Sequence, residues 1–270
     1  MHEEFEKTLF EINDGVATIT INRPEARNAL DEAVRRDLDL AISHIEKGSQ
    51  GDIHAAILTG SGDAFCAGGD ISALKNSSGK PAAEMRERLR SSHQLMTRWY
   101  NLDIPTIAAV NGTAAGAGFS LALACDFVLA DPNARFILSF GRIGLVPDWG
   151  ALYLLPRIVG LQKAKELCFS ARILAAQEAH DIGIVYRVVG SNEVLSEAKK
   201  FAVRFQSASS LSIGMTKSML NSSYERDLKT SLEIESSAQA IANNSDYHKE
   251  AVKRFLNKEP SIFDWEKLSK

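Results

Sequence analysis

The stretch Ala64-Phe65-Cys66-Ala67-Gly68-Gly69-Asp70-Ile71 leads from a short apolar run into a loop of small residues. A second stretch of the same kind, Asn111-Gly112-Thr113-Ala114-Ala115-Gly116-Ala117-Gly118, precedes an apolar helical segment at Phe119–Ala124. Small residues let a backbone approach a ligand closely, and a helix start presents N–H groups without partners in the helix. Two such loops facing one point would form an oxyanion hole.

Each loop taken alone has a simpler interpretation, because glycines also make tight turns and let helices pack closely on strands. Neither loop matches a phosphate-binding loop. The second lacks the Gly-Lys-Ser/Thr ending, and the first lacks the required glycine spacing. Catalysis by backbone donors therefore depends on whether the two loops meet in the folded chain.

Strand and helix patterns alternate around these loops, which predicts an α/β core over residues 1–190. Asn13-Asp14-Gly15 is typical of a hairpin, and Asp31 is a candidate N-cap for a helix extending to about residue 47. The other expected elements are strands at Phe5–Ile12, Val16–Ile21, Ala55–Thr59, Thr106–Val110 and Phe127–Ala130, and a helix at Glu84–Asn101. From Ser191 onward only helical patterns occur, at Asn192–Gln206, Leu211–Leu220 and Asp227–Asn257. These patterns predict a helical C-terminal region over residues 191–270.

Composition favours an ordinary globular protein. Of the 270 residues, 45% are hydrophobic and 24% are charged, and the net charge of −3 provides no reason to expect nucleic acid or an anionic membrane as a partner. The cysteines Cys66, Cys125 and Cys168 form no metal-type pair, so we expect reduced thiols and no metal site. Without a secretory or mitochondrial leader pattern or an apolar run of about 18 residues, a cytoplasmic location is expected.

Four motifs, in this order and spacing, resemble the crotonase superfamily, also called the enoyl-CoA hydratase/isomerase family, over nearly the whole chain. They are Asn22-Arg23-Pro24 with Asn28-Ala29-Leu30, then Phe65–Ile71, Pro105–Asp126 and Ala179–Val189. The resemblance implies an α/β fold with a ββα-spiral core and an α-helical C-terminal trimerisation region. It also implies an acyl-CoA thioester substrate and a homotrimer, or a hexamer built as a dimer of trimers. Apolar residues at helical spacing suit such an interface, namely Ile234, Ala238, Ile241, Ala251, Val252 and Phe255.

The resemblance also assigns site residues. The N–H groups of Gly69 and Ala117 would hold the enolate oxygen of the thioester. Residues that would line the coenzyme A site are Ala26, Ala67, Asp70 and Ile71, beside Gly69 and Ala117. Coenzyme A enters as part of the substrate, so no separate cofactor is expected.

The carboxylates select among the reactions of the family. Hydratases of this family hold their water with two glutamates, and the matching positions here are Ser120 and Phe140. Asp148 remains, in a segment that resembles the ring-1,2-epoxyphenylacetyl-CoA isomerase branch and the catalytic aspartate of dienoyl-CoA isomerases. One carboxylate suffices to move a proton from one carbon to another, and apolar neighbours such as Leu145 and Trp149 would raise its pKa. Asp148 also precedes a helical run, however, and could serve as its N-cap.

Enoyl-CoA isomerisation is therefore the leading prediction for this chain. His93 precedes Pro105 at the spacing of a catalytic histidine in 4-chlorobenzoyl-CoA dehalogenases, which leaves dehalogenase-like hydrolysis as an alternative to a solvated or structural histidine. An enoyl-CoA hydratase that uses other groups is a further alternative. A non-catalytic CoA-binding homologue is the last, and it would have no use for a carboxylate directed at the acyl carbons. Cys66 is expected to be a packing residue.

Overall fold

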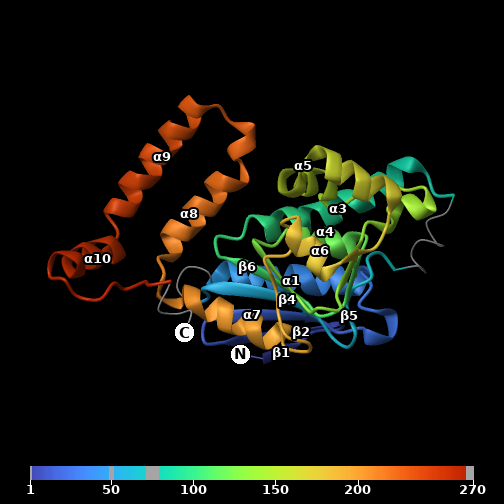
Figure 1. Cartoon of the computed structure of the whole chain (residues 1–270), viewed down its shortest axis with the longest axis horizontal. Coiled ribbons are helices and arrows are strands. Elements are labelled where there is room, and N and C mark those ends of the chain that lie inside the picture. The colour runs from blue at the N-terminus through green and yellow to red at the C-terminus, as the bar shows by residue number, and fades with distance from the viewer. Residues whose placement is uncertain (1, 49–51, 71–78, 266–270) are drawn as a thin grey trace.

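A twisted seven-stranded sheet forms the centre of the chain in a computed structural model, which describes residues 2–48, 52–70 and 79–265 (Figure 1). The strand order is β1-β2-β3-β4-β6-β8-β11, with antiparallel pairing from β1 to β3 and parallel pairing from β3 onward. The strands are β1 (His2–Glu4), β2 (Thr8–Asn13), β3 (Val16–Ile21), β4 (Ala55–Gly60), β6 (Thr106–Val110), β8 (Phe127–Ala130) and β11 (Arg187–Val188). The predicted hairpin is confirmed, because Asn13 pairs with Val16 across Asp14 and Gly15, both at positive φ.

A second, smaller sheet was not expected from the sequence. It has the order β10-β9-β7-β5, and it places two strands inside the stretches interpreted as loops. Its strands are β5 (Ala64–Cys66), β7 (Thr113–Ala115), β9 (Arg135–Ile137) and β10 (Leu174–Ala175). Strands of only two or three residues carry too little alternation to be recognised in a sequence.

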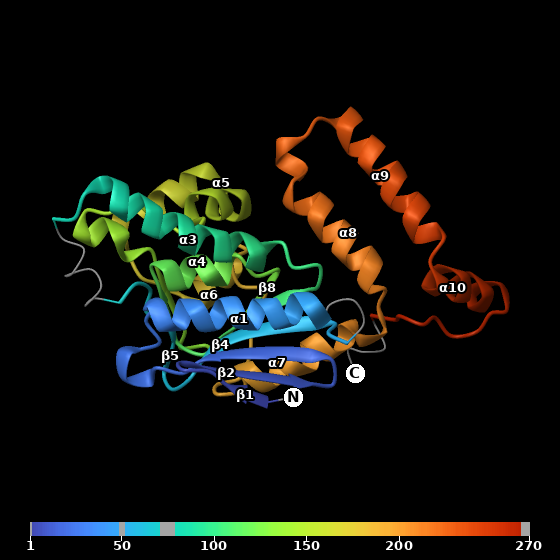
Figure 2. The same cartoon turned by 180° about the vertical axis from the view of Figure 1, so that it is seen from behind.

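Helices cover both faces of the large sheet, which explains why its parallel strands are almost entirely apolar. In Figures 1 and 2 the helices on one side are α1 (Glu32–Gly48), α3 (Ala82–Tyr100), α4 (Ala117–Leu123), α5 (Ala151–Ser170) and α6 (Ala176–Asp181). On the other side α7 (Val194–Val203) packs against Ile57 and Ala109. The predicted N-cap of α1 is confirmed, since Asp31 Oδ1 accepts from the Val34 N–H at 2.8 Å.

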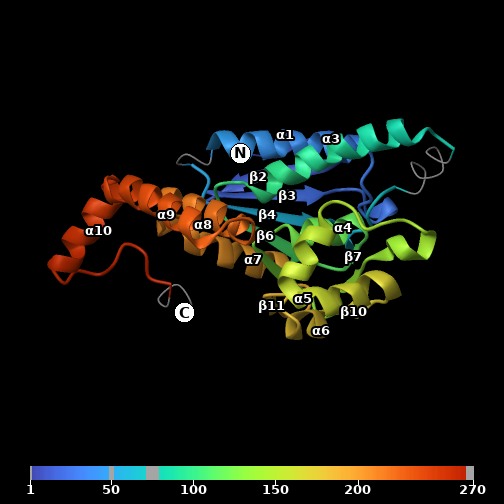
Figure 3. The ribbon, with the colours of Figure 1, turned by 90° about the horizontal axis from the view of Figure 1, so that it is seen from above.

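The last three helices extend away from the sheet as an arm (Figure 3). They are α8 (Ser210–Asn221), α9 (Leu228–Asn243) and α10 (Asp246–Leu256), and no residue of α9 or α10 is buried in the chain. The pattern read as continuous over Asp227–Asn257 is broken at Ser245, whose side chain caps α10 by accepting from the His248 N–H. Lys217 anchors α8 to the core, because its ammonium group lies 2.7 Å from Asp126 Oδ2.

The structure confirms a mixed α/β fold with a helical C-terminal region. The division at residues 190 and 191 stays a prediction, and α7, which follows it, packs on the sheet rather than in the arm. None of the described helices has the length and apolar character needed to cross a membrane.

Candidate active site

The two small-residue loops meet because the strands that lead into them are neighbours. Strands β5 and β7 run parallel, with Ala64 opposite Thr113 and Cys66 opposite Ala114. Carboxyl ends of parallel strands lie at one edge of a sheet, so both loops leave from the same edge. Gly69 follows β5 and Ala117 follows β7, and the chain thus brings these two predicted donors to one region.

Close backbone packing between the loops requires glycine at two positions. A Cβ atom on Gly68 would lie 2.6 Å from Ala115 O and 3.2 Å from Ala117 N, and Gly68 has a φ of +88°. A Cβ atom on Gly118 would lie 2.2 Å from Cys66 O. These distances are too short for any side chain, so the glycines are needed for the contact between the loops.

The surroundings of the two proposed donors differ. Ala117 is the first residue of α4 and is buried, whereas Gly69 is exposed and has open space where a side chain would be. Across the described ranges, neither N–H donates a hydrogen bond to another residue. Both groups are therefore available to an oxygen atom of a ligand, as an oxyanion hole requires.

Asp148 lies in the segment between the 3-10 helix η2 (Ser139–Ile143) and α5, with its carboxylate partly withdrawn from water. Its Oδ1 atom is buried and has no hydrogen-bond partner among the described residues, and burial raises the pKa of the carboxyl to about 6. The alternative role as a helix cap is wrong, because the N-cap of α5 is Gly150 and no side chain caps this helix. Next to Asp148, the buried Trp149 has a φ of +52°, which is unfavourable for a residue other than glycine.

The two positions that correspond to hydratase glutamates have structural contacts of their own. The hydroxyl of the fully buried Ser120 donates to Asp148 O at 2.9 Å, and it also lies 3.3 Å from Gly116 O. The ring of Phe140 lies 3.7 Å from the place where a Cβ atom on Gly116 would be. Ser120 thus joins the first turn of α4 to the segment that carries Asp148. No local sequence pattern indicates this contact, because the two residues are 28 positions apart.

The remaining predicted site residues lie around the first loop. Ala26 ends the 3-10 helix η1 (Pro24–Ala26), and the Ala67 N–H donates to Arg27 O at 2.9 Å. Asp70 forms an ion pair with Arg23 at 3.0 Å. Ile71 lies outside the described residues. Contact of these residues with coenzyme A stays a prediction.

Two other candidates have surroundings that do not favour catalysis. His93 is exposed on α3, whose buried side is formed by Ser92, Leu95, Met96 and Trp99. Cys66 is completely buried, and burial raises the pKa of its thiol to about 12, so it stays protonated. Both observations agree with structural or solvated roles rather than with a nucleophile or a general base.

Comparison with known proteins agrees with this geometry. The family model described as enoyl-CoA hydratase/isomerase matches residues 11–267. A 1,2-epoxyphenylacetyl-CoA isomerase of Escherichia coli (strain K12) is 34% identical over 94% of this chain and 97% of its own length. A short-chain-enoyl-CoA hydratase of Clostridium acetobutylicum is 35% identical over 94% of this chain and 96% of its own length.

Solved structures show the same similarity. An enoyl-CoA hydratase/isomerase from Cupriavidus metallidurans CH34 superposes with a TM-score of 0.92 at 37% identity, covering 97% of both chains. An enoyl-CoA hydratase from Polaromonas sp. JS666 superposes with a TM-score of 0.89 at 30% identity, covering 95% of this chain and 99% of the other. The family model matches almost the whole sequence, and the fold is shared with solved members of the family. This chain therefore belongs to the enoyl-CoA hydratase/isomerase family, the crotonase superfamily.

Proposed function

We propose that the chain is an enoyl-CoA isomerase, which moves a double bond along the acyl chain of a CoA thioester. The observation that carries this proposal is the state of Asp148, a desolvated carboxylate beside α4. One of its oxygen atoms is buried and has no hydrogen-bond partner within the described part of the chain. A pair of carboxylates that could hold a water molecule is missing at the hydratase positions, since Ser120 and Phe140 occupy them.

In the proposed mechanism Asp148 acts first as a base and then as an acid. It removes a proton from C2 of a 3-enoyl thioester, and the electron pair of that C–H bond moves onto the thioester oxygen. The Gly69 and Ala117 N–H groups stabilise the resulting enolate oxygen. Asp148 then returns the proton to C4, so that the double bond lies between C2 and C3. These steps require no metal and no cofactor apart from the coenzyme A of the substrate.

Hydration of a 2-enoyl thioester is the second candidate. The observation in its favour is that relatives named as hydratases match this chain at an identity similar to that of the named isomerase. The same two backbone donors would serve a hydratase, but other groups would have to hold the attacking water. A dehalogenase-like hydrolysis finds no support in the exposed position of His93. A binding protein without activity would gain nothing from the desolvation of Asp148.

The substrate preference of the purified protein tests the proposal. We expect 3-enoyl-CoA to be converted to 2-enoyl-CoA much faster than 2-enoyl-CoA is hydrated, because one carboxylate can move a proton but does not position a water molecule as a pair does. Products of 3-enoyl-, 2-enoyl- and arylacetyl-CoA would be identified by mass and by double-bond position. Hydration of 2-enoyl-CoA at an ordinary enzymatic rate would contradict the isomerase assignment and support the second candidate.

We also propose that the chain assembles as a homotrimer or as a hexamer in the cytoplasm. Apolar side chains on the arm are exposed, among them Ile241 and Phe255. A cavity of about 850 Å³ is lined by α8, α9, Glu46 and the segment that follows α3, Asn101 to Asp103. Exposed apolar surface of this kind marks contact sites. All three cysteines are free, in keeping with a reducing compartment.

Light scattering at micromolar concentration checks the assembly, with an expected mass of three or six chains. As a control, Phe255→Glu should lower the mass without unfolding the sheet, because Phe255 is exposed in the single chain. A mass equal to one chain would contradict the proposal.

A further inference from the structure

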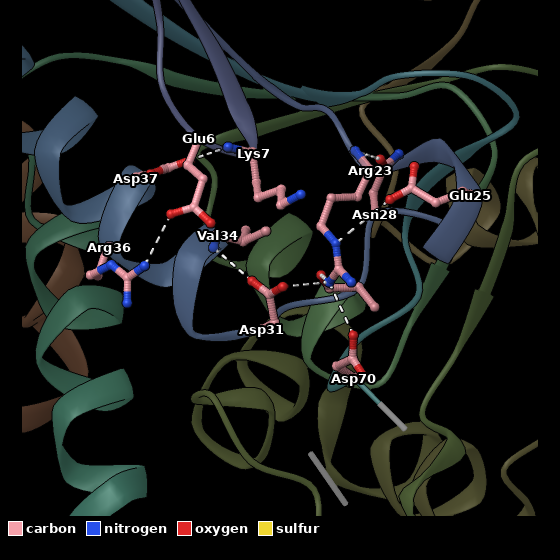
Figure 4. A network of polar contacts seen from close by, with 11 residues as sticks. Glu6, Lys7, Arg23, Glu25, Asn28, Asp31, Val34, Arg36, Asp37 and Asp70 are labelled. Atoms are coloured by element: carbon pink, nitrogen blue, oxygen red, sulfur yellow. Dashed lines mark hydrogen bonds and ion pairs between the residues drawn. The ribbon is translucent and has the colours of Figure 1, made fainter. Parts of the chain in front are cut away.

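Arg23 connects the turn after β3 to the loop that contains Gly69 (Figure 4). Its Nη1 atom lies 3.0 Å from Asp70 Oδ2 and 3.0 Å from Asp31 Oδ2, and it donates to Ala29 O at 2.9 Å. The side chains of Arg23 and Asp70 are only 14% and 13% exposed. An ion pair with so little contact with water holds its partners more firmly than a pair on the surface does.

Gly69 itself is held through its backbone, which forms an isolated parallel bridge with Leu30. It has no side chain, and no atom lies within 4 Å of the position that its Cβ would occupy. Its position therefore depends on this bridge and on its two neighbours in the chain. Gly68 is held by its carbonyl, which accepts from the Leu30 N–H at 2.7 Å, and Asp70 is held by the guanidinium of Arg23.

Arg23 is itself fixed by the core. The side chain of the fully buried Asn28 accepts from the Arg23 N–H at 2.9 Å and donates to Ala64 O at 2.7 Å. Asp31, the other carboxylate on the guanidinium, caps α1 through the Val34 N–H. The ion pair thus links Asp70 to a helix start and to the first residue of β5, which are rigid parts of the fold.

We propose that Arg23 is a positioning residue, which sets the place of the Gly69 N–H through its ion pair with Asp70. This inference rests on the proposed function in one respect, namely that the Gly69 N–H holds the thioester oxygen. It assigns Asp70 a role different from the direct contact with coenzyme A that the sequence suggested. Donors must be placed within roughly 0.5 Å of the productive geometry, and a displacement of about 1 Å can cost about 100-fold in rate.

The test compares Arg23→Gln, Arg23→Lys, Asp70→Asn and the double variant Arg23→Gln/Asp70→Asn. Arg23→Gln and Asp70→Asn should each lower kcat by about 10–100-fold and change KM by less than about threefold, because the enolate gains more from the Gly69 N–H than the bound substrate does. The double variant should be no slower than the slower single variant, since both changes remove one interaction. Arg23→Lys keeps the charge and should recover part of kcat.

Arg98→Gln provides a matched control. Arg98 also bridges two carboxylates, those of Asp39 and Glu46, but it links α1 to α3 on the outside of the molecule. This change should lower the melting temperature and leave kcat unchanged. If instead Arg23→Gln lowers only the melting temperature, or raises KM with kcat intact, Arg23 has a structural or a substrate-binding role and the proposal is overturned.

The choice of substrate separates this inference from the proposed function. Kinetics are measured with whichever thioester the wild-type protein converts fastest, and the oxyanion donors serve isomerisation and hydration alike. A hydratase would thus overturn the isomerase assignment and leave the test of Arg23 intact. If Arg23→Gln does not fold, Asp70→Asn decides: an undiminished kcat in that variant overturns the proposal, because an effect that passes through Asp70 must appear there.

Discussion

Replacing Asp148 with asparagine is expected to lower isomerase turnover by a factor on the order of 100–10,000, the usual contribution of a positioned general base. The change keeps the shape of the side chain and removes its ability to accept a proton. Affinity for a CoA thioester should persist, because the Gly69 and Ala117 N–H groups are untouched. Turnover and the dissociation constant of a product thioester are the two measurements.

The pH dependence provides a second measurement on Asp148. Since a base acts only when ionised and its pKa is about 6, kcat/KM of the wild type should fall as the pH drops below about 6. The same inflection should be absent from the residual activity of Asp148→Asn. A wild-type profile that is flat from pH 5 to 8 would argue against Asp148 as the base.

Asp148→Asn should not lower the stability of the protein at pH 8, whereas the loss of a helix cap would lower it. The pKa of Asp148 rises from 3.8 to about 6 on folding, so its stabilising contribution is present at low pH and is lost as the pH rises through 6. At pH 8 the asparagine variant should therefore be at least as stable as the wild type, with a gain of at most roughly 3 kcal/mol before solvent screening. An Asp148→Asn protein that melts early and keeps its activity would show that Asp148 is only structural.

Asp131→Asn is a suitable control for the chemical change itself. The two carboxylate oxygens of Asp131 accept from the N–H groups of Asn133 and Asn192, each at 2.8 Å. An amide can accept at only one of these positions, so this variant should be less stable while its turnover remains that of the wild type.

Replacing Gly69 with proline is expected to lower turnover by a factor on the order of 100–1,000, because proline has no N–H to donate to the enolate oxygen. The fold should survive the change. Gly69 has open space around the position of a Cβ atom, its φ is not in the left-handed region, and its N–H makes no hydrogen bond within the described part of the chain. The residue before it is Gly68, which has no Cβ atom for the proline ring to contact.

Two variants separate the loss of the donor from damage to the loop. Gly69→Ala keeps the N–H and places a methyl group in open space, so it should retain most of the turnover. Gly68→Ala should instead destabilise the protein, since a Cβ atom there would lie 2.6 Å from Ala115 O. A folded Gly69→Pro protein with turnover within threefold of the wild type would remove Gly69 from the oxyanion hole.

Elements with strong local signals were predicted correctly from the sequence. The hairpin at Asp14 and Gly15, the N-cap at Asp31 and the strand Thr106–Val110 each depend on residues within a few positions of one another. Turn chemistry, capping and apolar runs act over that distance. The same reasoning could not find β5 and β7, because strands of three residues carry too little local signal and are defined only by their pairing with each other.

The family was likewise determined by the sequence, because motif order and spacing are properties of the chain itself, and the roles of the site residues stay predictions. What only the tertiary structure decided is how those residues meet. Parallel pairing of β5 with β7 brings Gly69 and Ala117 to one edge of the small sheet. The N-cap of α5 is Gly150 rather than Asp148, and burial raises the pKa of the Asp148 carboxyl. The ion pair of Arg23 with Asp70 joins residues 47 positions apart. Desolvation and contacts over such distances arise only when the chain is packed, and therefore no local pattern can encode them.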